Sequence, residues 1–234
     1  MRQIAILSIV LFTLASCQHE TGSGNIIKEK KPVGNFTALS AGSGFEVEVK
    51  IGSPVSVEIE ADDNLMKYIK VKVEGNMLRI DAKNNFSISN GHFKAYVTVP
   101  ALDEIESSGA ADINVLDEIK SSGKVRLHAS GAAKITAKVD APKVDAESSG
   151  AANIEVSGRT KDIYADASGG AVIEADELLS ENADAEASGA GSVHISASVK
   201  VKAKASGAGN VYYKGGASNV QADESGAGNV HKED

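Results

Sequence analysis

The sequence has no tryptophan, four prolines and a single cysteine, and aromatic residues make up only 4% of its 234 residues. With one cysteine, no disulfide can form within the chain, so the fold must be stabilised by packing alone. So few aromatic side chains are not enough to fill a large globular core. The 23 glycines, together with abundant Ala, Val and Ile, favour a thin core between closely spaced walls.

Cationic side chains are also scarce, because 24 Lys and Arg stand against 32 Asp and Glu, for a formal net charge of -8. Nucleic acid is therefore excluded as a partner, since binding its phosphates requires an excess of Lys and Arg. The five histidines are scattered without the spacing of a metal motif. No cofactor is predicted.

The N-terminus lacks an apolar run long enough to span a bilayer. Residues 4–14 are largely apolar, but this run is shorter than the roughly 17–25 residues that a membrane-spanning helix needs. It follows a short basic start, so we predict a signal peptide over residues 1–16. The end of this segment, Leu14-Ala15-Ser16-Cys17, resembles the bacterial lipobox. The resemblance implies cleavage before Cys17 and lipid attachment to it; the alternative is an ordinary signal peptide with an incidental cysteine.

A lipid on Cys17 would make the membrane a partner of the chain and place it in the cell envelope, anchored in the outer membrane. Which face of that membrane the lipid occupies is left open. Residues 17–33 are polar, charged and without apolar alternation. They predict a lipidated cysteine followed by a flexible tether.

The most distinctive pattern is a Ser-Gly phrase, followed by small residues and an apolar residue, that recurs seven times. The seven glycines are Gly109, Gly131, Gly150, Gly169, Gly189, Gly207 and Gly226, separated by 22, 19, 19, 20, 18 and 19 residues. A period near 19 with short alternating strands is typical of a β-solenoid. Each glycine is expected at the same structural corner, where the backbone excludes a side chain.

We therefore predict an all-β fold in which residues 101–234 form a right-handed parallel β-solenoid of about seven turns, each of about three short strands. Residues 34–100 show the alternation of longer, half-buried strands, with a hairpin at Gly75-Asn76 and a polar loop over 84–92. Because the end of a solenoid exposes unpaired backbone, we interpret this section as a wider N-terminal cap. Residues 34–234 are expected to form one structural unit.

Several phrases resemble a known bacterial family. They are the Ser-Gly-Ala repeats, residues 209–215 (GNVYYKG), residues 225–228 (SGAG), residues 63–65 (DNL) and the strand end at 78–80 (LRI). Over residues 35–230, the chain resembles the family called putative auto-transporter adhesin, head GIN domain. The resemblance implies a β-solenoid envelope lipoprotein of the Bacteroidetes type, from a domain family of unknown function.

In a stack of equivalent turns, outward residues about 19 positions apart lie in ladders. One ladder contains Glu147, Asp166 and Glu186, whose mutual repulsion a bound cation would relieve. These three residues are candidates for a weak Ca²⁺ site. The alternative is a solvated wall on which the carboxylates splay apart.

A second ladder ends in rings. Its members are Asn114, Thr136, Glu155, Glu174, His194, Tyr212 and His231. With Tyr213, the rings of His194, Tyr212 and His231 are candidates for a platform that stacks sugars. The alternative is that they only decorate a strand, for which rings have good propensity.

No residue is predicted to be catalytic, because the serines recur in every turn and the uniform turns leave no insertions to form a cleft. We predict a non-catalytic envelope lipoprotein whose solenoid is a binding or adhesion module for a glycan or a protein. Two alternatives remain open: a polysaccharide-processing β-helix enzyme, and a purely structural or assembly subunit. The oligomeric state is not predicted.

Overall fold

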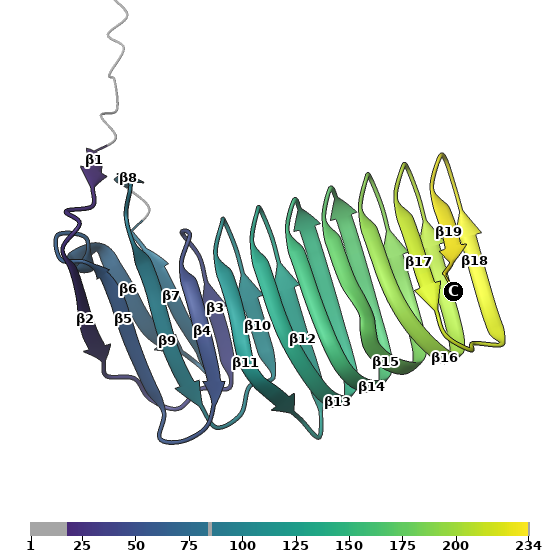
Figure 1. Ribbon diagram of the computed structural model, residues 1–234, viewed down its shortest axis with the longest axis horizontal. Helices are drawn as coiled ribbons and strands as arrows, with labels where there is room; N and C mark the ends of the chain where they lie inside the picture. Colours follow the sequence, from purple (N-terminus) through teal and green to yellow (C-terminus); the bar gives the residue numbers. More distant parts are fainter. Residues whose placement is uncertain (1–17, 84–85, 234) are drawn as a thin grey trace, which may run out of the picture.

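The computed structural model describes residues 18–83 and 86–233, which fold almost entirely into β-strands (Figure 1). Seventeen strands form one sheet that coils along a single axis, and β1 (Gln18–Thr21) pairs separately with β8 (Phe86–Ser89). The described part contains one short 3₁₀ turn, Met66–Tyr68. None of its residues belongs to a helix that is long and apolar enough to cross a membrane.

The repeats form a parallel β-solenoid, which confirms the predicted fold class. Each coil pairs with the previous one at the repeat spacing, so that Ile135 lies beside Ile154 and Ile154 beside Ile173. All three side chains are fully buried, because inward positions of successive coils stack into the core. The strands are β10 (Glu104–Ser107), β11 (Asp112–Lys120), β12 (Lys124–Ala129), β13 (Lys134–Gly150), β14 (Asn153–Gly169), β15 (Val172–Ala187), β16 (Ser192–Ala205), β17 (Asn210–Lys214), β18 (Asn219–Glu224) and β19 (Asn229–Lys232).

Each coil has two walls, where about three strands were expected. Wall A is formed by the strand segments that precede each Ser-Gly, namely β10, β12, β18 and the second halves of β13–β16. Wall B is formed by the segments that follow each Ser-Gly, namely β11, β17, β19 and the first halves of β13–β16. The walls meet at glycine tips, seen as a row of points in Figure 1. At the opposite edge, the pairing of β13 with β14 continues through the bend, from Val139–Gly158 to Ala141–Thr160. At this edge the chain therefore has no additional corner that would divide the coil into a third strand.

The repeat glycines lie in a column at these tips. All seven have a positive φ, between 69° and 78°. A Cβ on Gly150 would lie 2.8 Å from the carbonyl oxygen of Gly131, and the N–H of Ala151 donates to the same oxygen at 2.7 Å. Backbone thus stacks directly on backbone, which leaves no room for a side chain.

The N-terminal section continues both walls. β3 pairs in parallel with β10 of wall A, and β4 with β11 of wall B. Its core is bulkier than that of the repeats, since Phe45 is fully buried and its ring centroid lies 5.2 Å from that of Phe93. Its strands are β2 (Ile26–Lys31), β3 (Ala38–Ala41), β4 (Glu46–Ile51), β5 (Ser56–Asp62), β6 (Ile69–Glu74), β7 (Met77–Ala82) and β9 (Phe93–Val99). The predicted hairpin at Gly75-Asn76 joins β6 to β7.

The flexible tether predicted over residues 17–33 is wrong for most of that segment. β2 pairs antiparallel with β5 along its whole length, and β1 pairs with β8 inside the predicted 84–92 loop. β2 is an edge strand exposed on both faces, so its sequence carries no apolar alternation to reveal it. The predicted signal peptide and the lipid site, Cys17, lie outside the described residues.

Asp62 fastens this segment to the cap. Its side chain is almost fully buried (1% exposed), and its carboxylate accepts hydrogen bonds from the N–H groups of Gly24 (2.7 Å) and His92 (2.8 Å). We expect Asp62→Ala to lower the free energy of unfolding by about 2 kcal/mol, because two donors lose a charged acceptor. Urea unfolding followed by circular dichroism measures the loss, and limited proteolysis detects release of residues 18–31.

The neighbouring Asp63 provides a matched control. Its carboxylate is exposed and accepts hydrogen bonds from Ser23 Oγ and Asn25 Nδ2, so Asp63→Ala should cost less than about 1 kcal/mol. Equal losses in the two variants, or unchanged proteolysis of Asp62→Ala, would show that Asp62 does not hold the segment.

Candidate functional site

The second predicted ladder forms on wall B. Asn114, Thr136, Glu155, Glu174, His194, Tyr212 and His231 are register partners in successive coils. The centroids of His194 and Tyr212 lie 4.6 Å apart with their planes 13° from parallel, and those of Tyr212 and His231 lie 5.4 Å apart at 19°. We call these three rings the ring stack. Because His194 and His231 cover the two faces of Tyr212, the stack presents mainly ring edges to a ligand.

Tyr213 does not belong to the ring stack. It is partly buried and packs against the core, whereas Tyr212, one position earlier, points outward. Successive side chains of a strand point to opposite faces. Including Tyr213 in the outward platform was therefore wrong.

A shallow acidic depression of about 250 Å³ lies beside this ladder. Glu155, Glu174 and Asp176 contribute carboxylates to its lining. The Nζ of Lys214 donates to Asp176 at 2.9 Å and is the main cause of the lowered pKa of that carboxyl. Sequence reasoning missed this pair, because the register shifts between Ala175 and Leu179 and breaks the repeat spacing there.

The first predicted ladder forms on wall A. Glu147 pairs with Asp166, and Asp166 with Glu186, in successive coils. The carboxylates line up without converging, since no group of three His, Cys, Asp or Glu side chains is placed to hold a metal ion anywhere in residues 18–83 and 86–233. The cation site at these residues stays a prediction.

Wall A also contains a hollow of about 410 Å³ around Tyr164, which we call the Tyr164 hollow. Tyr164 lies between Asp145 and Asp184 of the adjacent coils, and its hydroxyl lies 3.4 Å from Asp166 Oδ2. Burial, together with the carboxylates of Asp166, Glu186 and Glu147, raises the pKa of Tyr164 to about 12. The phenol therefore stays protonated and can donate a hydrogen bond at neutral pH. The lining includes Lys143, Asp145, Asp162, Asn182, Asp184 and Lys200.

Polar groups around the hollow are only partly satisfied. Asn182 Nδ2 donates to Asp162 Oδ1 at 2.8 Å. Asp145 Oδ2 accepts from Lys124 Nζ at 2.6 Å, whereas its buried Oδ1 has no hydrogen-bond partner and lies 3.7 Å from Lys143 Nζ. The sequence analysis gave Tyr164 no role. The available signal was a tyrosine at an outward position of a wall whose other outward residues are mostly charged.

Comparison with known proteins identifies the family. Residues 35–217 match the family model described as putative auto-transporter adhesin, head GIN domain. The chain belongs to this family. No curated protein is significantly similar to this head GIN domain protein.

Solved structures with the same fold come from Bacteroides and Parabacteroides species. A putative adhesin from Bacteroides fragilis NCTC 9343 has a TM-score of 0.86 at 20% identity, covering 92% of this chain and 100% of that one. A protein described as a putative lipid binding protein, from Parabacteroides distasonis ATCC 8503, has a TM-score of 0.75 at 19% identity, covering 93% and 100%. A putative adhesin from Parabacteroides merdae ATCC 43184 has a TM-score of 0.73 at 21% identity, again covering 93% and 100%.

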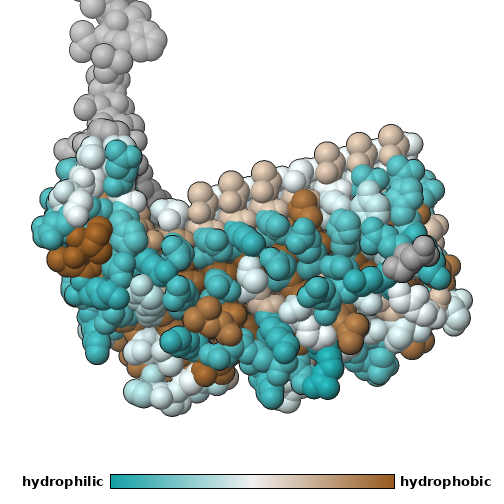
Figure 2. Space-filling model, in the orientation of Figure 1, coloured by the Kyte–Doolittle hydropathy of each residue, from teal (hydrophilic) through white to brown (hydrophobic). Residues whose placement is uncertain are grey.

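These likenesses confirm the fold. The family that the chain matches is described as a putative adhesin, which supports a surface binding module in general. Figure 2 agrees for the face it shows, which is mainly hydrophilic, with the tips as a paler row along its upper edge.

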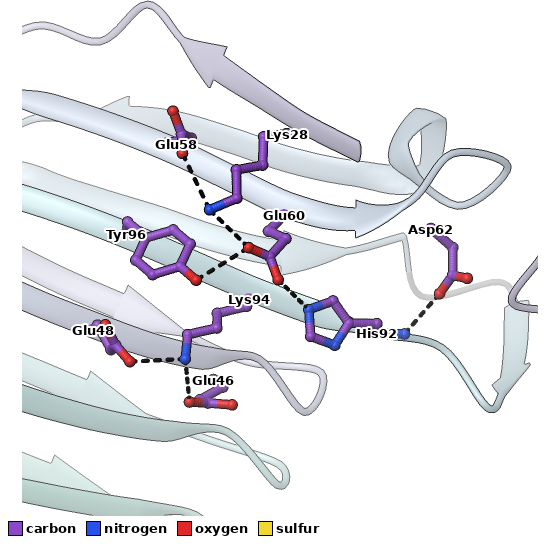
Figure 3. A network of polar contacts seen from close by, with 9 residues as sticks. All are labelled: Lys28, Glu46, Glu48, Glu58, Glu60, Asp62, His92, Lys94 and Tyr96. Carbon is purple, nitrogen blue, oxygen red and sulfur yellow. Dashed lines mark hydrogen bonds and ion pairs between the residues drawn. The ribbon is translucent and has the colours of Figure 1, made fainter. Parts of the chain in front are cut away.

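At the N-terminal cap of this head GIN domain, a charged network joins β2, β5 and β9 (Figure 3). Glu60 accepts a hydrogen bond from Lys28 Nζ at 2.9 Å, lies 2.8 Å from His92 Nε2, and accepts another from the Tyr96 hydroxyl at 3.1 Å. The bonds with Lys28 and His92 are the largest causes that lower the pKa of Glu60 to about 2. Glu60 is therefore ionised and fully engaged at neutral pH.

Lys94 extends this network to β4. Its Nζ lies 2.7 Å from carboxylate oxygens of both Glu46 and Glu48, and these hydrogen bonds raise the pKa of Lys94. Each charge in Figure 3 thus has a partner within the protein. The network fastens the cap strands together and leaves little free bonding capacity for a ligand.

Proposed function

We propose that the chain is a non-catalytic lipoprotein, anchored in the outer membrane through Cys17, that binds glycans in the Tyr164 hollow. The observation that carries this proposal is that the ring of Tyr164 lies inside a hollow lined by carboxylates, an amide and ammonium groups. In the described part of the chain, no other ring stacks on Tyr164. Tyr164 is half-buried and held by its strand, so its position is fixed before a ligand arrives.

The chemistry of the hollow matches that of a sugar. A pyranose has an apolar face that packs on an aromatic ring and hydroxyl groups that need hydrogen-bond partners at their edges. Asp145, Asp162, Asn182 and Asp184 supply such partners around Tyr164. A volume of about 410 Å³ lies within the ordinary range of small-ligand sites.

The test compares two outward tyrosines on opposite walls. We expect Tyr164→Ala to weaken binding to the glycans that the wild-type protein selects on an array by about tenfold, corresponding to roughly 1.4 kcal/mol of lost ring contact. Tyr164→Phe, which keeps the ring, should bind within about threefold of wild type. Affinities are measured by calorimetry on the purified full-length protein.

Tyr212→Ala is the matched control, because the two faces of that ring are already covered. It should leave glycan binding unchanged. Loss of binding in Tyr212→Ala with retention in Tyr164→Ala would instead place the site at the ring stack on wall B. An array without any glycan hit would contradict glycan binding altogether.

A further inference from the structure

A second depression adjoins the Tyr164 hollow on wall A. It has a volume of about 240 Å³, and Asp145 and Glu147 line both depressions. We call it the Arg126 depression, and its other polar lining residues are Glu104, Glu106, Arg126 and His128. Because the two depressions share lining residues, one ligand can occupy both.

The two depressions follow one another along the solenoid axis, across the strands. Their lining includes one line of register partners, which comes from β10, β12 and β13–β16 (Figure 1). Five steps separate the six strands, so at roughly 4.8 Å per step the path is about 24 Å long. A single sugar ring covers only a small part of this length. The register partners are Glu104, Arg126, Asp145, Tyr164, Asp184 and Lys202.

Charges along this path are balanced within the protein. The ion pairs are Glu104–Arg126, Glu106–Arg79, Asp145–Lys124, Asp145–Lys143, Glu147–His128 and Asp184–Lys202. In the described part of the chain, the charged lining residues without an ion pair are Asp162 and Lys200, which have opposite signs. A charged ligand would lose its hydration without gaining an excess of opposite charge, so the path favours a neutral one.

The Arg126 depression retains unused hydrogen-bonding capacity. A guanidinium has five N–H donors, and Glu104 accepts from one of its nitrogens, Nη2 of Arg126, at 3.0 Å. The side chain of His128 is half exposed, and a neutral imidazole offers one donor and one acceptor. Sugar hydroxyl groups can therefore find partners here as well as in the Tyr164 hollow.

Resting on the proposed glycan-binding function, we infer that the ligand is a neutral polysaccharide of the extended, β-1,4-linked kind, lying along the axis from the Tyr164 hollow into the Arg126 depression. One sugar packs on Tyr164, and the following sugars exchange hydrogen bonds with the groups around Arg126. An extended chain fits because its sugars advance by about the spacing of neighbouring coils, roughly 4.8 Å. The site then recognises the interior of a polymer and not a terminal sugar.

The experiment compares disaccharides with hexasaccharides of β-1,4-linked glucose, mannose and xylose. Calorimetry on the purified full-length protein should show, for at least one of these sugars, that the hexasaccharide binds at least tenfold more tightly than the disaccharide. In Arg126→Ala, this advantage should fall to threefold or less while the affinity for the disaccharide stays unchanged. Unchanged disaccharide binding also shows that the variant is folded. Tyr164→Ala, by contrast, should weaken binding of both lengths.

Arg159→Ala is the matched control, because it also removes an exposed arginine that is paired with one carboxylate, Asp140, but that lines neither depression. It should keep the full advantage of the hexasaccharide, and a loss equal to that of Arg126→Ala would overturn the inference.

Three further outcomes separate the inference from the proposed function. Equal affinity for the two lengths, or an advantage that persists in Arg126→Ala, would overturn binding along the path and leave glycan binding intact. The same holds if no hexasaccharide binds but the array yields a glycan of another kind. Failure of every hexasaccharide, together with an empty array, would overturn the proposed function itself.

Discussion

Gly150→Ala is expected to lower the free energy of unfolding by about 3 kcal/mol or more. The residue has a φ of 78°, and a left-handed backbone costs an alanine about 1–2 kcal/mol. In addition, the new Cβ would lie 2.8 Å from the carbonyl oxygen and 3.3 Å from the Cα of Gly131. These atoms are backbone, so they move only if the two coils separate and the hydrogen bond from Ala151 to Gly131 is lost.

The column supplies its own control. Gly109 is the first of the seven, with a similar φ of 70°, but a Cβ there would meet nothing closer than the backbone nitrogen of Ser43 at 3.5 Å. Gly109→Ala should therefore cost only the conformational term, about 1–2 kcal/mol. Urea unfolding followed by circular dichroism measures both variants. Equal losses of unfolding free energy in Gly150→Ala and Gly109→Ala would show that the backbone contact between coils adds nothing to stability at the tips.

Cys17→Ser is expected to release the protein from the membrane. Each buried methylene of an attached acyl chain contributes about 0.8 kcal/mol, and two or more chains anchor a protein stably. Without the thiol, the membrane-to-soluble ratio should fall by more than tenfold. Cell fractionation measures this ratio, and metabolic labelling with a palmitate analogue measures lipid attachment directly.

Ser16→Ala is the control for Cys17→Ser, because it keeps a small residue before the cysteine and should leave labelling unchanged. A wild-type protein that takes up no label and fractionates as soluble would favour the ordinary signal peptide. A Cys17→Ser variant that stays labelled would place the lipid at another residue.

The solenoid was predictable because its information is periodic. A spacing of about 19 residues fixed which positions lie above one another, and both ladders formed with the predicted register. The same repetition made the column of glycines visible. Because the pattern recurs in every coil, an irregularity in one coil does not hide the repeat.

What could not be predicted depends on single contacts. β2 has a pairing partner in β5 but no alternation of its own, so nothing local distinguishes it from a linker. The covering of Tyr212 by His194 and His231 depends on rotamers that ladder order does not fix. The Tyr164 hollow likewise depends on how the side chains of neighbouring coils splay, which spacing alone does not determine.

The attachment of β2 to the cap fixes the distance between the N-terminal edge of the molecule and the proposed binding site. The first described residue after the predicted lipid site, Gln18, already belongs to β1, which pairs with β8. Six strand-to-strand steps lead from β2 through β5, β9, β4, β11 and β13 to β14, which carries Tyr164. At roughly 4.8 Å per step, the stand-off from the N-terminal edge is about 29 Å. In the proposed lipoprotein, the strand ladder itself therefore sets the distance between the N-terminal edge and the proposed binding site.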